Sequence, residues 1–151
     1  MRYMLLIYSK EAQMEAMSGE EAERIRGAHH AVMQATAARG IFRGAEPLKS
    51  TATATTVRMQ NGRSLIIDGP FAETKEQLAG YYILDCEDLD EAIRWAEKIP
   101  TACKGGEGCV EIRPIMAIPQ PTNAMSQAGA MSEAGATSQA GATSQAEQAD
   151  E

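Results

Sequence analysis

The stretch IIDGPFAETKEQLAGYY, residues 66–82, joins two apolar runs through a sharp interruption at Asp68-Gly69-Pro70-Phe71. Gly69 permits backbone angles that other residues avoid, and Pro70 fixes its own φ, so this interruption predicts a turn. The second apolar run, 78–86, carries apolar groups at both odd and even positions, which is typical of a strand covered on both faces. The stretch therefore predicts two strands of a sheet joined by a turn.

Capping and turn signals on either side of this stretch give the order strand, helix, strand, hairpin, strand, helix, strand. Ser18-Gly19-Glu20-Glu21 is a capping box that opens a helix, and Gly40 ends this helix. Asn61-Gly62 is the favoured two-residue turn of a hairpin. Asp88 opens the second helix, and Pro100 ends it. Strands are expected at 2–8, 41–48, 55–59, 64–68, 78–86 and 110–116.

This order predicts an α+β fold, a ferredoxin-like βαββαβ core with an added hairpin strand. Two helices cover one face of such a sheet, and the strands at 2–8 and 78–86 present apolar side chains to the other face. An uncovered apolar face of that size is unusual in soluble monomers. We therefore expect a homodimer in which two sheets stack face to face.

Residues 119–151 differ in composition from the rest of the chain. A six-residue pattern of small and polar residues repeats there from Met125 and fades after Gln148. Such a segment buries too little apolar surface to offset the entropy of ordering it. We expect a folded domain at 1–118 and a disordered, low-complexity tail at 119–151.

The 151 residues carry 14 Lys and Arg against 21 Asp and Glu. This acidic balance argues against a basic surface for nucleic acid. No apolar run reaches the roughly 18 residues of a membrane span, and no leader sequence is apparent, so a cytoplasmic protein without a membrane partner is expected. Cys86, Cys103 and Cys109 show no CxxC spacing, and the sequence has no glycine-rich phosphate loop and no HxxxH motif. No cofactor or metal is predicted.

Five segments resemble the DGPF family of YCII-related proteins and occur in the family's order. The resemblance covers 1–118 and implies a ferredoxin-like α+β fold that pairs into a dimeric α/β barrel. It implies no settled reaction. Most members are uncharacterised bacterial proteins, some are encoded beside extracytoplasmic-function sigma factors, and enzymes of aromatic degradation occur in the wider superfamily. The segments are MRYMLLIY (1–8), TATTVR (53–58), DGPFAETKE (68–76), GYY (80–82) and VEIRPIM (110–116).

Asp68 has two interpretations. In the structural one, its carboxylate accepts backbone N–H groups of the following turn while Phe71 packs into the core. In the functional one, Asp68 faces a cleft between the two sheets as an acid or base. Thr74 and Lys75, which follow in the same run, could fix a substrate carboxylate or phosphate.

His29 is the second catalytic candidate. Its spacing from Ile25 and Val32 sets it on the helix face toward the sheet, where the alternative is an ordinary core histidine. The resemblance implies a His in this helix paired with an acid from an Asp-Pro pair after the second helix. The corresponding pair here is Ile99-Pro100, so that acid is missing. Asp68 could replace it only if the fold brings the two together.

Two functions remain open from the sequence. One is a cofactor-independent isomerase or lyase that moves a proton on a small molecule in a dimer cleft, with Tyr81 or Tyr82 lining the cleft. The other is a non-catalytic dimer that binds a small-molecule ligand or contacts a regulatory protein such as a sigma factor.

Overall fold

A computed structural model describes residues 1–101 and 108–118. The predicted tail at 119–151 and Cys103 lie outside these residues. The predicted order of strands and helices is confirmed, and one short helix is added after the first strand. The elements are β1 (Arg2–Ser9), α1 (Glu11–Glu15), α2 (Gly19–Ala38), β2 (Phe42–Pro47), a 3₁₀ turn (Thr51–Thr53), β3 (Thr55–Gln60), β4 (Arg63–Asp68), β5 (Gln77–Asp85), α3 (Leu89–Ala96) and β6 (Gly108–Pro114).

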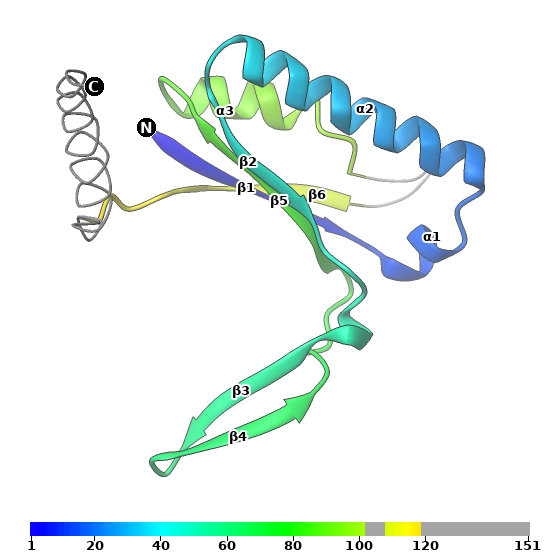
Figure 1. Cartoon of the computed structure of the whole chain (residues 1–151), viewed down its shortest axis with the longest axis vertical. Helices are drawn as coiled ribbons and strands as arrows, with labels where there is room; N and C mark the ends of the chain where they lie inside the picture. The colour runs from blue at the N-terminus through cyan, green and yellow to red at the C-terminus, as the bar shows by residue number, and fades with distance from the viewer. Residues whose placement is uncertain (102–107, 119–151) are drawn as a thin grey trace, which may run out of the picture. The chain divides into compact units, whose positions relative to one another are not determined.

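Four strands form the main sheet in the order β2-β5-β1-β6, and each neighbouring pair is antiparallel. This is the strand order of a ferredoxin-like α+β fold, so the predicted fold class is confirmed. The helices α2 and α3 both lie over one face of the sheet (Figure 1). No helix among the described residues is long and apolar enough to cross a membrane.

The hydrophobic core lies between the helices and the sheet. Alternate residues of β1 point into it because side chains along a strand alternate between its two faces. Leu5 of β1 and Leu84 of β5 have no exposed surface, and α3 contributes Trp95. The buried apolar residues are Tyr3, Leu5, Ile7, Val32, Tyr82, Leu84, Cys86, Ala92, Trp95 and Ile99.

Both helices begin at the caps that the sequence predicts. The Ser18 hydroxyl accepts a hydrogen bond from the backbone N–H of Glu21, and the Asp88 carboxylate accepts one from the N–H of Glu91. These bonds satisfy backbone donors that the first turn of a helix leaves without partners. Gly40 follows α2 with a φ of 72°, a conformation that favours glycine, and ends that helix as predicted.

One charged residue of α3 is buried. Glu91 is 7% exposed, whereas the apolar Leu89 and Ile93 are exposed. The Glu91 carboxylate accepts a hydrogen bond from the Glu87 N–H at 2.8 Å and pairs with Arg39 at 3.0 Å. These two contacts offset the free-energy cost of removing the carboxylate from water.

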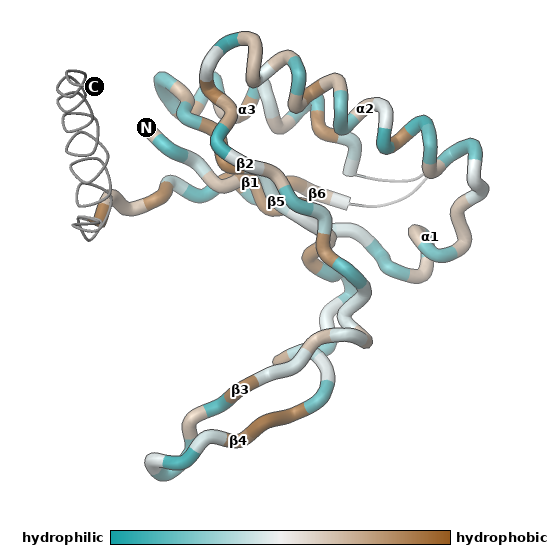
Figure 2. Tube along the Cα trace, viewed as in Figure 1, coloured by the Kyte–Doolittle hydropathy of each residue, from teal (hydrophilic) through white to brown (hydrophobic). Residues whose placement is uncertain are grey.

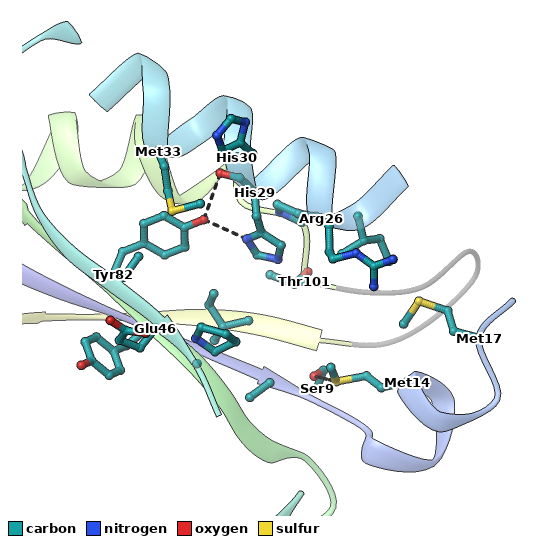
Figure 3. Close-up of a pocket in the computed structure, with 18 of the residues that line it drawn as sticks. Ser9, Met14, Met17, Arg26, His29, His30, Met33, Glu46, Tyr82 and Thr101 are labelled. Atoms are coloured by element: carbon teal, nitrogen blue, oxygen red, sulfur yellow. Dashed lines mark hydrogen bonds between the residues drawn. The ribbon is translucent and has the colours of Figure 1, made fainter. Parts of the chain in front are cut away.

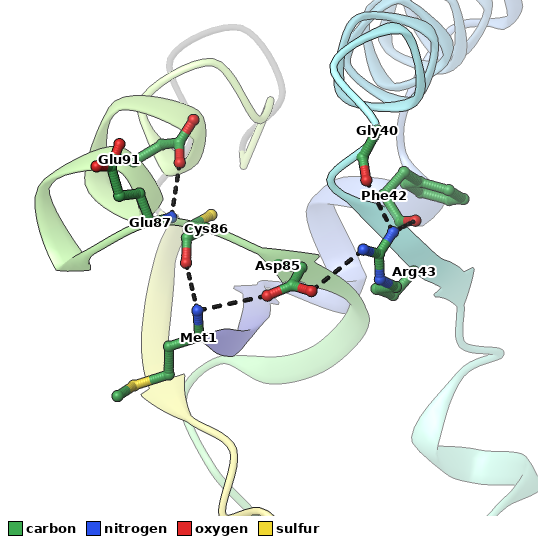
Figure 4. Close-up of polar contacts among 8 residues, drawn as sticks. All are labelled: Met1, Gly40, Phe42, Arg43, Asp85, Cys86, Glu87 and Glu91. Carbon is green, nitrogen blue, oxygen red and sulfur yellow. Dashed lines mark hydrogen bonds and ion pairs between the residues drawn. The ribbon is translucent and has the colours of Figure 1, made fainter.

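The ends of β1, β2 and β5 are tied together by polar contacts (Figure 4). The Met1 ammonium donates to the Cys86 carbonyl at 2.6 Å and lies 3.4 Å from the Asp85 carboxylate. Arg43 of β2 binds the other oxygen of Asp85 at 3.1 Å. The ammonium and the guanidinium hold the pKa of Asp85 below its usual value.

The hairpin forms as predicted but does not add a strand to the main sheet. β3 and β4 pair only with each other, as a separate two-stranded sheet that extends away from the helix-covered body (Figure 1). Asn61 and Gly62 at its turn both have positive φ, as the two-residue turn requires. We call Thr55–Asp68 the arm.

The face of the main sheet opposite the helices carries no other element of the described chain, and we call it the open face. Its centre is apolar, and each of these side chains is partly buried by its neighbours in the sheet. Dimerisation through this face stays a prediction. The apolar side chains of the open face are Met4, Leu6, Tyr8, Tyr81 and Ile83.

Candidate functional site

A cavity of about 460 Å³ lies on the helix-covered side of the sheet, between α1, α2 and the strands β1, β2 and β5. This volume lies within the range of small-molecule sites. Apolar groups dominate its walls, among them Ile7, Ile25 and Met33. Little polar surface faces the cavity, and its polar residues include the buried Ser9 and Tyr82 and the half-buried His29.

His29 of α2 and Tyr82 of β5 are in direct contact within this cavity (Figure 3). The Nδ1 atom of His29 lies 2.9 Å from the Tyr82 hydroxyl oxygen, and the two rings stack with centroids 6.0 Å apart. The Tyr82 hydroxyl also lies 3.4 Å from the backbone carbonyl of His29, to which it can donate. The hydroxyl thus contacts both the ring and the backbone of one residue.

One arrangement of protons satisfies both contacts. If His29 Nδ1–H donates to the Tyr82 oxygen, the Tyr82 O–H can donate to the His29 carbonyl. In this tautomer, assigned from the hydrogen-bond network, Nε2 carries a lone pair. The second nitrogen of His29 is then a proton acceptor on a ring that lines the cavity.

Burial sets the charge state of both residues. Desolvation lowers the pKa of His29 below its ordinary value of 6.5, because the apolar surroundings disfavour the imidazolium. Desolvation also raises the pKa of Tyr82 to about 12. At neutral pH both groups are uncharged, as a base and its hydrogen-bonding partner require.

Methionines form much of the cavity wall at the α1 end. Met14 and Met17 lie at the end of the cavity away from Tyr82 (Figure 3). The Ser9 hydroxyl donates to the Met14 sulfur at 3.0 Å, which links β1 to α1. Unbranched thioethers adapt to ligands of different shape. The sequence analysis missed this wall because α1 has only five residues and its apolar pattern is too short to detect.

Asp68 lies elsewhere, at the end of β4 in the arm, and does not line the cavity. Within the described residues, its carboxylate makes no hydrogen bond or ion pair. The turn after it is held by carbonyls, since Gly69 accepts from the Thr56 hydroxyl at 2.8 Å and Phe71 from Arg58 at 2.9 Å. Gly69 has a φ of 99°, which favours glycine.

The structural interpretation of Asp68-Gly69-Pro70-Phe71 is therefore wrong about the contacts of Asp68 and about the burial of Phe71. The Asp68 carboxylate does not accept the N–H groups of the turn in the described chain. Phe71 does not pack into the core, because 75% of it is exposed. Asp68 and His29 are not brought into contact.

The other predicted binding residues are also separated. Thr74 and Lys75 lie exposed between β4 and β5, where the Thr74 hydroxyl donates to the Glu76 carbonyl at 2.6 Å. Tyr81 and Tyr82 are adjacent in β5 and both are among the residues that line the cavity, but their side chains lie on opposite faces of the sheet. Of these four side chains, that of Tyr82 contacts His29. In the part of the chain that the structure describes, no group of three or more His, Cys, Asp or Glu side chains could hold a metal ion.

Comparison with known proteins agrees with the fold and leaves the reaction open. The YCII-related domain model matches residues 1–119. An uncharacterised protein of Rhizobium meliloti (strain 1021) is 39% identical over 115 residues, which cover 76% of this chain and 92% of that protein.

Proposed function

The chain belongs to the YCII-related domain family, and we propose that it binds a small, largely apolar molecule beside His29 and moves a proton on it without a cofactor. The observation that carries this proposal is the pairing of His29 with the Tyr82 hydroxyl at 2.9 Å inside an apolar cavity. Family membership supports the fold and does not identify the reaction.

The proposed chemistry uses His29 as a general base. Nε2 takes a proton from an acidic C–H or O–H of the bound molecule, and the substrate keeps the electron pair. The imidazolium so formed keeps its Nδ1–H bond to the Tyr82 oxygen, which fixes the orientation of the ring. Return of the proton to a different atom gives an isomerisation, and departure of a leaving group with the electron pair gives an elimination.

In this proposal Tyr82 is the hydrogen-bonding partner of His29, in place of the acid that an Asp-Pro pair would supply. Ile99 is buried in the core at that position, so no carboxylate is supplied there. A neutral phenol stabilises an imidazolium less than a carboxylate does, and burial already lowers the pKa of His29. The site therefore suits substrates with fairly acidic protons, such as those next to a carbonyl in a conjugated ring.

Hydrogen exchange into a bound compound tests this function directly. A panel of small cyclic carbonyl compounds is screened for binding by saturation-transfer NMR, and binders are then incubated with the protein in D₂O. We expect the wild-type protein to catalyse deuterium incorporation and the His29→Gln variant to bind without catalysing it. Catalysis that persists in His29→Gln would show that another group is the base.

Asp68→Asn is the matched variant because Asp68 lies outside the cavity. We expect it to retain both binding and exchange. Loss of exchange in a folded Asp68→Asn protein would instead favour Asp68 as the catalytic acid or base.

The second candidate is a ligand-binding protein without catalysis, which could act on a regulatory protein such as a sigma factor. Within residues 1–101 and 108–118 no carboxylate contacts His29, and this favours it. Binding of a compound with exchangeable protons, without deuterium incorporation at any pH at which the protein is folded, would support this candidate over the enzyme.

A further inference from the structure

Arg26 is the charged residue of α2 that lines the cavity beside His29. The charged residues of this helix all lie in its first half, 19–28, which is the more hydrophilic half of α2 in Figure 2. Residues three positions apart on a helix are neighbours, with Cβ atoms about 5–6 Å apart. Arg26 therefore lies one turn before His29, on the side away from Tyr82 and toward Met17 (Figure 3).

The fixed charge beside the cavity is positive, although the chain as a whole is acidic, with a formal net charge of −7. Among the described residues that line the cavity, Lys10, Arg26 and Glu46 are charged at neutral pH. Glu46 pairs with Tyr81 across β2 and β5, so its side chain lies with that of Tyr81 on the open face. The other two residues are cations, and they attract an anionic group of a bound molecule.

The ion pair that Arg26 makes within the protomer is weak. Its Nη2 atom lies 3.1 Å from a carboxylate oxygen of Glu23, and the two side chains are 64% and 74% exposed. Exposed pairs of this kind contribute little to stability, because water screens the charges and both side chains lose rotamer freedom. Arg26 can therefore exchange the Glu23 carboxylate for that of a ligand at little cost in free energy.

We propose that the molecule bound beside His29 is a small carboxylate with an apolar ring, and that Arg26 binds its carboxylate while the ring occupies the apolar part of the cavity. This substrate class rests on the proposed function for the position of the reacting C–H, at His29 Nε2. The guanidinium presents two parallel N–H donors that match the two oxygens of a carboxylate.

A phosphate fits this position less well than a carboxylate. Phosphate sites commonly use the backbone N–H groups at the start of a helix, which have no partner within the helix. Arg26 lies in the interior of α2, which begins at Gly19, so the N–H groups around it are bonded within the helix and add no donors. The planar guanidinium is the donor that this part of α2 supplies.

Binding of the carboxylate also orients the ring. With one end held by Arg26, the ring presents to His29 the C–H bonds on one side only. A proton transfer between two particular atoms requires such a fixed orientation, and orientation of this kind lowers the barrier by an entropic contribution. Arg26 is therefore a specificity-determining residue of the proposed site.

Paired ligands that differ in one charge test the proposal. The panel consists of cyclic enones, each as the carboxylate and as the neutral carboxamide of the same skeleton, beginning with 3-oxocyclohex-1-ene-1-carboxylate. We expect calorimetric titration to show that the wild-type protein binds the carboxylates about tenfold more tightly than the carboxamides. Arg26→Gln should weaken carboxylate binding about tenfold and change carboxamide binding by less than about twofold.

Arg24→Gln is the matched control. It removes the same charge from the same half of α2, and Arg24 does not line the cavity. This variant should keep the preference for carboxylates. Both arginines are exposed, so both variants should fold, and circular dichroism checks this.

The outcomes separate this inference from the proposed function. Equal binding of carboxylates and carboxamides by the wild-type protein, a preference that survives in Arg26→Gln, or an equal loss in Arg24→Gln would overturn the inference. Deuterium incorporation into a bound carboxamide would then still support the proposed function. Carboxylate binding that depends on Arg26, without deuterium incorporation, supports the inference and contradicts the proposed catalysis. If no member of the panel binds, both are overturned.

Discussion

Tyr81 and Tyr82 are neighbours in β5, yet the Tyr82 hydroxyl contacts His29 beneath α2 whereas the Tyr81 side chain lies on the open face. The alternation of side chains along a strand produces this separation. Two residues that differ little in sequence context therefore present their side chains to two different faces of the sheet, Tyr82 to the helix side and Tyr81 to the open face.

Replacing each tyrosine by phenylalanine should separate these surfaces. Tyr82→Phe removes the hydrogen bond to His29 and should lower the free energy of unfolding by about 1 kcal/mol. Tyr81→Phe should change it by less than about half that amount, as for most substitutions away from buried polar contacts. Chemical denaturation of the two variants measures both values, and an equal loss in both would contradict the assignment.

Alkaline titration gives a further readout of Tyr82. With its pKa raised to about 12, Tyr82 should ionise at a higher pH than an ordinary tyrosine, whose pKa is near 10. The neutral form favours the folded state, so this contribution to stability is present below pH 10 and is lost as the pH rises toward 12. The late step in ultraviolet absorbance should disappear in Tyr82→Phe. A Tyr82 that titrates near 10 in the folded protein would show that it is not desolvated.

The pKa of His29 predicts a dependence of stability on acid. Because burial lowers this pKa below 6.5, the unfolded chain binds the proton more readily. The contribution of His29 is therefore fully present above pH 6.5, and it decreases as the pH falls from 6.5 to the folded-state pKa. NMR titration of the His29 ring protons, assigned with a His30→Gln variant, should show a midpoint below 6.5. A midpoint above 6.5 would mean that an acidic partner faces the ring.

Gly80 is placed where the backbone of β2 comes close. A Cβ at this position would lie 2.7 Å from the Glu46 carbonyl oxygen, a distance that requires the strands to separate. We expect Gly80→Ala to lower the free energy of unfolding by about 1–3 kcal/mol, as for overpacked sites. Gly27→Ala is the control, since no atom lies within 4 Å and a helical alanine should stabilise by about 0.5–1 kcal/mol. Thermal unfolding of both variants should show shifts of opposite sign.

Glu11 secures the base of the arm. Its carboxylate accepts from the Thr51 N–H at 2.6 Å and from the Ser50 hydroxyl at 3.0 Å, and its backbone N–H donates to Gln77. Glu11→Gln should lower the free energy of unfolding by about 1 kcal/mol, less than for a buried charged hydrogen bond because water reaches the site. Glu15→Gln, at the exposed end of α1, should have no measurable effect.

The pH dependence checks the Glu11 contacts separately. The hydrogen bond from the Thr51 N–H lowers the pKa of Glu11, so this stabilisation is present above about pH 4.5 and is lost as the pH falls through the lower, folded-state pKa. The difference in stability between wild type and Glu11→Gln should therefore decrease in acid. A difference that stays constant from pH 7 to pH 3 would show that the charge is not responsible.

Local signals in the sequence were sufficient for the fold. The caps at Ser18 and Asp88, the Asn61-Gly62 turn and the end of α2 at Gly40 each depend on one or a few neighbouring residues. The separate position of the arm could not be predicted in this way. Whether β3 and β4 extend the main sheet depends on long-range pairing, and their alternating apolar pattern is compatible with either arrangement.

The candidate site was predicted only in part for the same reason. Helical spacing correctly placed His29 on the face toward the sheet. Its contact with Tyr82 joins residues 53 positions apart, and no local pattern indicates it. The DGPF run drew attention to Asp68 as a candidate catalytic residue. In the structure the run forms a turn, which depends on the positive φ of Gly69 and on the hydrogen bond from the Thr56 hydroxyl of β3 to the Gly69 carbonyl.

The arm contributes none of the buried core residues, which come from the main sheet, α2, α3 and the segments just before and after α3. Mutations in the arm can therefore accumulate without repacking the interior or altering the walls of the cavity.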